Sequence, residues 1–117
     1  MNDTRFGWLV LVPRISGLSE ITDLDDAQQA QLWHEVNVVG AALRACVPCD
    51  KLNIGALGNI VRQLHVHVVA RVEGDAAWPG PVWGSGKATA YADTALANRL
   101  TALRLSLQDL ALQHPAN

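Results

Sequence analysis

Hydrophobic residues follow two different periods along this chain, and the periods predict its main elements. An apolar run from Trp8 to Val12 ends at Pro13, and its length and β-branched content predict a strand buried on both faces. From Ala27 to about Ala45 the period is helical, and the acidic and hydroxyl side chains of residues 22–26 favour a helix N-terminus before it. The predicted inner stripe of this helix comprises Leu32, Trp33, Val36, Val39, Leu43 and Cys46.

The second half of the chain predicts two strands and a second helix. Leu52 to Ala56 is a short strand candidate, and Gln63 to Val72 is a longer one. Asp93 can cap a helix that Pro115 would follow, with an inner stripe of Leu96, Leu100, Leu103, Leu107 and Leu110. The order strand, helix, strand, strand, helix predicts an α+β domain, in which the two later strands pair antiparallel and the helices cover one face.

Residues 63–72 carry the strongest chemical signal, because alternate residues of a strand share a face. One face holds Leu64, Val66, Val68 and Ala70, and the other holds Gln63, His65, His67, Val69 and Arg71. An unpartnered buried polar side chain costs about 1–3 kcal/mol, so this polar row predicts a face that is wet or that binds a polar ligand. Imidazoles suit nucleophilic or acid–base work, although an exposed sheet face or a two-histidine zinc site would show the same pattern.

Composition limits the classes of protein that fit this pattern. The chain has 117 residues, half of them hydrophobic and 17% charged, with a net charge of -2. This is enough apolar material for a single domain over residues 1–117, at roughly one domain per 150 residues, and it excludes a disordered tail or a charge-driven partner of nucleic-acid polymers. No apolar run approaches the roughly 20 residues of a membrane span, and the N-terminus lacks a signal-peptide pattern, so we expect a cytoplasmic protein without a membrane partner.

Two smaller motifs remain open. The spacing Cys46-Val47-Pro48-Cys49 can serve redox exchange or half of a zinc site, but no second ligand pair is present and the motif ends a helix. We therefore predict no metal and no cofactor, and assign no role to His34, which lies beside the helical stripe. The segment Trp78 to Gly84 holds two Trp and two Pro, and it predicts a packed loop that closes over a site or a dimer seam, or that covers a core edge.

The stretch Leu52 to Arg71 resembles the signature of the histidine-triad (HIT) superfamily. That signature runs Asn-x-Gly, a few residues, Gly-Gln, then His-φ-His-φ-His-φ-φ, where φ is apolar, and the chain reads LNIGALGNIVRQLHVHVVAR. The strand ending at Pro13, the loop and the helix follow the family's order. The sequence of residues 78–84, WPGPVWG, is similar to that of a bacterial subgroup of HIT hydrolase-like proteins.

The resemblance implies a fold and an assembly. It implies an antiparallel sheet of about four to five strands with two main helices, and a homodimer whose strands join into one sheet. Relatives of the subgroup have further residues that form a strand before Met1, so the single domain over residues 1–117 is expected to lack that strand or to begin at an internal start.

The resemblance also implies an activity: cleavage at the α-phosphate of a dinucleoside polyphosphate, a nucleoside phosphoramidate or an adenylylated compound. The sequence has no P-loop and no acidic metal cluster, so a metal-free covalent route suits its residues better than a Mg-dependent one. By position, His65 is the nucleophile that forms a nucleotidyl-histidine intermediate, and His67 contacts phosphate oxygens. Asn53 touches the bridging or leaving-group oxygen, Asn59 is the amide near the phosphates, and Asn2 binds the ribose hydroxyls.

Two departures from the family pattern leave a second function open. Gln63 occupies the first triad position and can bind substrate but cannot titrate, and Trp8 replaces a frequent phosphate-side histidine. The backbone carbonyl of residue 63 could orient His65 whatever its side chain. A nucleotide-binding protein with little or no turnover is therefore the alternative to the enzyme, and a zinc or redox protein built on Cys46 and Cys49 is the third possibility.

Overall fold

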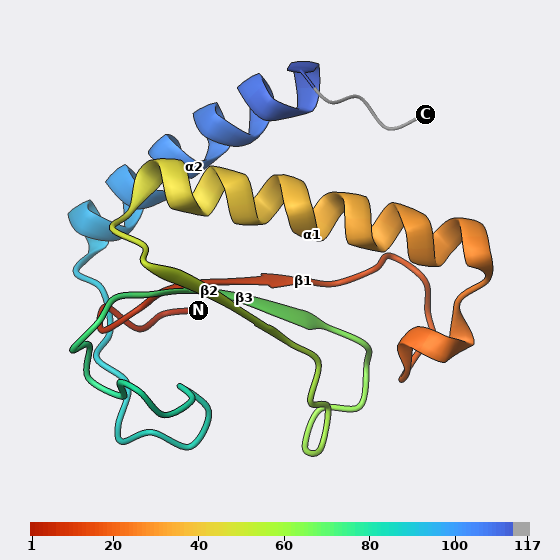
Figure 1. Cartoon of the computed structure of the whole chain (residues 1–117), viewed down its shortest axis with the longest axis horizontal. Coiled ribbons are helices and arrows are strands. Elements are labelled where there is room, and N and C mark those ends of the chain that lie inside the picture. The colour runs from red at the N-terminus through yellow and green to blue at the C-terminus, as the bar shows by residue number, and fades with distance from the viewer. Residues whose placement is uncertain (114–117) are drawn as a thin grey trace.

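Three antiparallel strands form the sheet, and two helices cover one of its faces (Figure 1). The computed structural model describes the backbone of residues 1–113 and the side chains of residues 1–110, so the predicted stop at Pro115 lies outside the described residues. The elements follow the predicted order and are β1 (Gly7–Leu11), the 3-10 helix η1 (Ile21–Asp23), α1 (Asp26–Cys46), β2 (Lys51–Gly55), β3 (Val66–Arg71) and α2 (Asp93–Gln113). The α+β class with an antiparallel sheet and helices on one face is confirmed.

The described sheet has three strands rather than the expected four to five, in the order β1-β3-β2. The segments that precede and follow β3 do not add strands to this sheet. The segment between β2 and β3 turns at Gly58, which has a positive φ of 70°, and leaves Ile60 and Val61 exposed. The segment before α2 contains Gly84 and Gly86, also at positive φ, together with two prolines that have no amide to donate.

The strand buried on both faces is β3, not β1. β1 pairs only with β3, so it is an edge strand whose residues are all half-buried, and Val12 beyond it is exposed. All six residues of β3 are buried. The strand also begins at Val66, so Gln63 and His65 lie in the loop that leads into it rather than in the strand.

Helix α1 starts with a reciprocal cap and packs on β3. Asp25 accepts from the backbone N–H of Gln28, and the Gln28 side chain accepts from the Asp25 N–H. The buried residues of the helix are Leu32, Val36, Gly40, Ala42 and Leu43. Trp33, predicted for the inner stripe, is instead 45% exposed, because the buried face of the helix runs through Leu32 and Val36 and does not include Trp33.

Helix α2 packs across α1 and adds Leu103 to the core between helices and sheet. Asp93 is its first helical residue rather than its cap, since the amide of Leu96 bonds the carbonyl of Ala92. Of the predicted leucine stripe, Leu103 is buried, whereas Leu100 is 38% exposed. Within the described part of the chain, neither helix is long and apolar enough to cross a membrane.

The second face of the sheet is covered as well, so of the two predicted alternatives, a wet face or one that binds a polar ligand, the open wet face is wrong. Phe6, Val69 and Val82 form a small core there, with Trp8, Ala77 and Trp83 packed against it. The covering segments come from the N-terminus and from the residues between β3 and α2, which lie opposite the helices in Figure 1.

A buried guanidinium holds this cover in place. Arg71 ends β3 and is only 1% exposed. Its Nε and Nη2 donate to the two carboxylate oxygens of Asp75 at 2.8 and 2.9 Å, and its Nη1 donates to Oδ1 of Asn53 at 2.8 Å. The rings of Phe6 and Trp78 lie 5.7 and 5.6 Å from the guanidinium carbon, so the charge is both paired and stacked.

We expect Asp75→Ala to lower the free energy of unfolding by about 3–5 kcal/mol, because it leaves a buried guanidinium without its counter-charge. The hydrogen bonds from Arg71 hold the pKa of Asp75 at about 2. The unfolded carboxyl titrates near 3.9, so the contribution of this pair is complete above that pH and is lost as the pH falls towards 2.

Urea denaturation at neutral pH measures this change. Glu73→Ala is the matched control, because Glu73 is an exposed acidic residue two positions away, and a surface substitution usually stays within about 0.5 kcal/mol. Equal effects of the two substitutions would show that the ion pair does not stabilise the fold.

Candidate functional site

Two imidazoles lie side by side where the chain enters β3. His65 precedes the strand and His67 is its second residue, and their ring centroids are 5.0 Å apart at an interplanar angle of 72°. Alternation places both on the face opposite the helices, as predicted. His65 is half-buried and His67 is 8% exposed, so the pair lies at the margin of the cover rather than on an open surface.

A backbone carbonyl orients His65. Its Nδ1 lies 2.7 Å from the carbonyl oxygen of Gln63. A carbonyl can only accept, so Nδ1 carries the proton and the neutral ring presents the lone pair of Nε2. The expectation that the backbone of residue 63 orients this histidine is confirmed. The Gln63 side chain is used elsewhere, since its Nε2 donates to the carbonyl of Ile15 at 3.3 Å.

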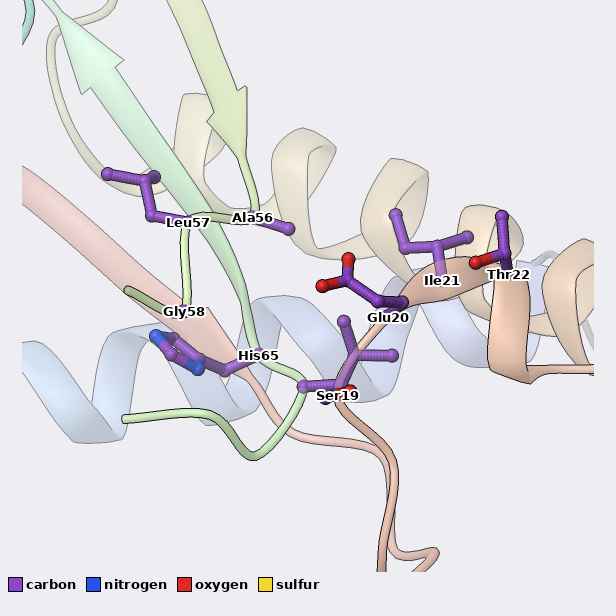
Figure 2. Close-up of a pocket in the computed structure, with 9 residues that line it drawn as sticks. Ser19, Glu20, Ile21, Thr22, Ala56, Leu57, Gly58 and His65 are labelled. Carbon is purple, nitrogen blue, oxygen red and sulfur yellow. The ribbon is translucent and has the colours of Figure 1, made fainter. Parts of the chain in front are cut away.

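His65 forms one wall of a hollow of about 150 Å³. Figure 2 shows its ring beneath the turn of Ala56, Leu57 and Gly58 that follows β2, with Glu20 and Ile21 on the other side. The positive φ of Gly58 makes this turn possible without strain. The hollow therefore joins three segments that are far apart in sequence: the loop before α1 with η1, the turn after β2, and the entry to β3.

His67 is enclosed by two indoles. Nε1 of Trp8 donates to Nδ1 of His67 at 2.9 Å, and the Trp83 ring lies 5.5 Å from the imidazole. Trp83 reaches this position because Gly55, the register partner of His67, has no side chain: a Cβ there would be 3.0 Å from Cη2 of Trp83. Burial, then the charges of His65 and of the N-terminus, lower the pKa of His67.

The predicted amides lie at different distances from this pair. Asn53 is on the same face of the sheet, opposite Val69 in the register, and Arg71 holds its Oδ1, so its Nδ2 remains available as a donor. Asn59 is exposed in the turn beside Gly58. Asn2 lies apart from the hollow beside His65, with its Oδ1 accepting from the amide of Tyr91 at 2.9 Å.

Sequence reasoning missed Arg71 and Asp75 as supports of the site. The signal was present, since a charged residue at the end of an apolar strand needs a partner, and an acidic residue follows four positions later. It also missed the hydrogen bond from Trp8 to His67, because a tryptophan within an apolar run indicates a packing role and not a donor.

The cysteines belong to the other side of the sheet. Cys46 and Cys49 pack against the helix-side core, and the thiol of Cys46 donates to the carbonyl of Ala102 at 3.6 Å. No group of three or more His, Cys, Asp or Glu side chains within residues 1–110 is arranged to hold a metal ion.

The family model and the similar solved structures both indicate one family. A model described as HIT domain matches residues 1–74. A histidine triad protein from Bradyrhizobium japonicum is 51% identical and superposes with a TM-score of 0.88, over 92% of this chain and 80% of that one.

Two further histidine triad proteins of known structure are similar. The one from Sinorhizobium meliloti 1021 is 49% identical with a TM-score of 0.83, over 93% of this chain and 78% of that one. The one from Marinobacter aquaeolei VT8 is 41% identical with a TM-score of 0.89, over 95% and 81%. Among proteins with curated descriptions, none matches this chain.

We expect His67 to titrate below the ordinary histidine pKa of about 6.5. As the pH falls through 6.5 the unfolded chain takes up this proton first, so the folded state loses stability between 6.5 and the folded pKa. His67→Gln should flatten the pH dependence of unfolding in that window, measured by urea denaturation from pH 7.5 to 5. His34→Gln removes an imidazole from α1 and should keep the decline in the free energy of unfolding as the pH falls. If His34→Gln removed that decline instead, the assignment to His67 would be contradicted.

Proposed function

Because this chain belongs to the histidine triad (HIT) domain family, we propose that it is a nucleotidyl hydrolase or transferase that cleaves its substrate at the α-phosphate through His65. The observation that carries the proposal is the hydrogen bond from Nδ1 of His65 to the Gln63 carbonyl. It leaves Nε2 as a lone pair beside an open hollow, which is the form of imidazole that attacks phosphorus.

The proposed reaction has two displacements. In the first, Nε2 of His65 bonds to the α-phosphorus, the bond from phosphorus to the leaving group breaks, and the leaving group departs with the electron pair and takes a proton. In the second, the oxygen of water, or of another acceptor in a transfer, bonds to phosphorus as the bond to Nε2 breaks. The attacking oxygen gives up a proton to solvent; water yields the nucleoside monophosphate, whereas another acceptor yields the nucleotidylated acceptor. His65 returns to its starting form in both cases.

Donors on the face of the sheet that carries His65, and in the turn after β2, suit the charge that develops on the phosphoryl oxygens. His67 lies on the same face, Nδ2 of Asn53 is free to donate, and Asn59 extends from the adjacent turn. Because Arg71 fixes the Asn53 amide, this donor is oriented before substrate arrives, which is the condition for strong electrostatic stabilisation. Asn2 is the proposed ribose contact and Gln63 a further substrate contact, both on the family alignment.

The proposed substrates are those that the family resemblance implies: a dinucleoside polyphosphate, a nucleoside phosphoramidate or an adenylylated compound. The hollow of about 150 Å³ is smaller than an ordinary ligand pocket of roughly 300–1,000 Å³, so it accounts for the groups close to the phosphorus rather than for a whole nucleotide.

One observation favours a second function, nucleotide binding with little or no turnover. The amide at the first triad position is bonded to Ile15 and offers no titratable group to the site. Binding of the same nucleotides without product release would support this alternative.

We expect His65→Ala to abolish turnover while nucleotide binding and folding persist, since the side chain borders the hollow rather than filling the core. The protein is mixed with nucleotides labelled at the α-phosphate, quenched in alkali, and tested for label that acid releases, because a phosphoryl–imidazole bond is acid-labile. Wild-type protein should carry label and His65→Ala none.

Two further variants separate the proposed nucleophile from the groups that surround it. His67→Ala should lower the rate by about 10²–10³, the usual loss for one stabilising donor, and still carry label. Gln63→Ala keeps the backbone carbonyl and should retain labelling. Turnover by His65→Ala would exclude the covalent route, and binding without turnover in wild type would leave the binding-only function.

We also propose a homodimer. Ile54 on the edge strand β2 and Trp33 on α1 are both exposed, and an edge with exposed apolar side chains favours pairing with another chain. Sedimentation should give twice the chain mass of 12.6 kDa at micromolar concentration. A sharp boundary at the monomer mass would contradict the dimer.

A further inference from the structure

Trp8 meets His67 across the sheet through a nitrogen–nitrogen hydrogen bond. The register pairs Trp8 with Val69, so His67 is its diagonal neighbour, within reach of a long aromatic side chain. The Nε1 to Nδ1 distance is 2.9 Å. An indole N–H can only donate, so Nδ1 of His67 must be the acceptor and must be unprotonated.

We infer that Trp8 is a positioning residue that holds His67 in the Nε2–H tautomer and so makes Nε2 a hydrogen-bond donor. A neutral imidazole carries one N–H, and with Nδ1 engaged as an acceptor that hydrogen resides on Nε2. This tautomer is the opposite of the one that the Gln63 carbonyl imposes on His65. The two neighbouring histidines therefore carry their N–H on different ring nitrogens because their Nδ1 partners differ.

The aromatic surroundings keep the imidazole from turning away. The Trp8 ring lies edge-on to His67, with centroids 5.6 Å apart at 61°, and Trp83 closes the other side at 5.5 Å. The ring centroid of Trp8 lies 6.3 Å from that of Phe6 and 6.2 Å from that of Trp83. With His67 only 8% exposed, a ring flip, which exchanges Nδ1 with Cδ2, would turn a C–H group toward the Trp8 indole and leave its N–H without this acceptor.

The same bond opposes the cationic form, because a proton on Nδ1 would place two N–H groups against each other. The ionisable groups that face His67 act in the same direction: His65 from its own segment and the Met1 ammonium from the N-terminus. Its other neighbours do not ionise, since β1 contributes Trp8, β2 contributes Gly55 and the loop before α2 contributes Trp83. That the Nε2–H of His67 donates to a phosphoryl oxygen rests on the proposed function, whereas the tautomer itself does not.

The test is nitrogen NMR on protein labelled with ¹⁵N, with no nucleotide present. In wild type at pH 7.5 we expect a single His67 tautomer with an unprotonated Nδ1, and a scalar coupling between that nitrogen and the Trp8 indole nitrogen. In Trp8→Phe the Nδ1 signal should move to an exchange-averaged position, and the pKa of His67 should rise by about 0.4–1, the equivalent of one neutral hydrogen bond.

Trp83→Phe is the matched control. It also replaces an indole that packs on His67, but among the described residues Nε1 of Trp83 has no hydrogen-bond partner. The coupling to Trp8 and the single tautomer should therefore survive it. Equal shifts in the two variants would assign the effect to burial rather than to the bond, and would overturn the inference.

The wild-type spectrum decides the matter even if Trp8→Phe does not fold. A proton on Nδ1 of His67, or no coupling to the Trp8 indole, overturns the inference. Because no substrate is used, failure of the proposed reaction leaves this result unaffected, and a wrong tautomer leaves the labelling of His65 to be judged separately.

Discussion

The face of the sheet that carries the histidines depends on one buried charge. A guanidinium that is almost fully removed from water is stable only if its donors are satisfied, and Arg71 satisfies them with Asp75 and Asn53. These partners come from different segments, so one requirement ties the end of β3 to β2 and to the loop beyond β3. Phe6 and Trp78, stacked on the same group, add the N-terminal segment and the start of the cover.

This arrangement explains why the site is enclosed rather than wet. Asp75 holds the beginning of the loop, and a few residues later Trp83 lies over Gly55 and against His67. Burial then acts on His67 by favouring its neutral form, whereas His65 stays at the margin beside the hollow. Two histidines separated by a single residue thus occupy different environments, one in the loop that enters β3 and the other within the strand.

Gln63 and Trp8 each support one of the two histidines in this geometry. Gln63 contributes to His65 through its carbonyl, which any residue would supply, and its side chain links the strand entry to the loop at Ile15. Trp8 offers His67 a donor that cannot change protonation. The shared frame is extensive, since relatives at 41–51% identity superpose over 92–95% of this chain.

The sequence by itself determined the order of the elements and the face that carries the two histidines. Local periodicity was sufficient for α1 and for the alternation from Leu64 to Arg71, because side-chain direction in a helix or strand follows from backbone geometry alone. The orientation of His65 was equally accessible, since its partner is two residues away on the same backbone.

The tertiary structure decided which strand is central, what covers the histidines and how His67 is held. β1 reads as more apolar than β3, yet strand order makes it the edge, and no local pattern encodes that order. Trp8 and His67 are 59 residues apart, and Arg71 and Asn53 are 18 apart. Hydrogen bonds between such residues arise only when the strands pair in one register, so the proton position on His67 is a property of the folded sheet and not of the segment that contains it.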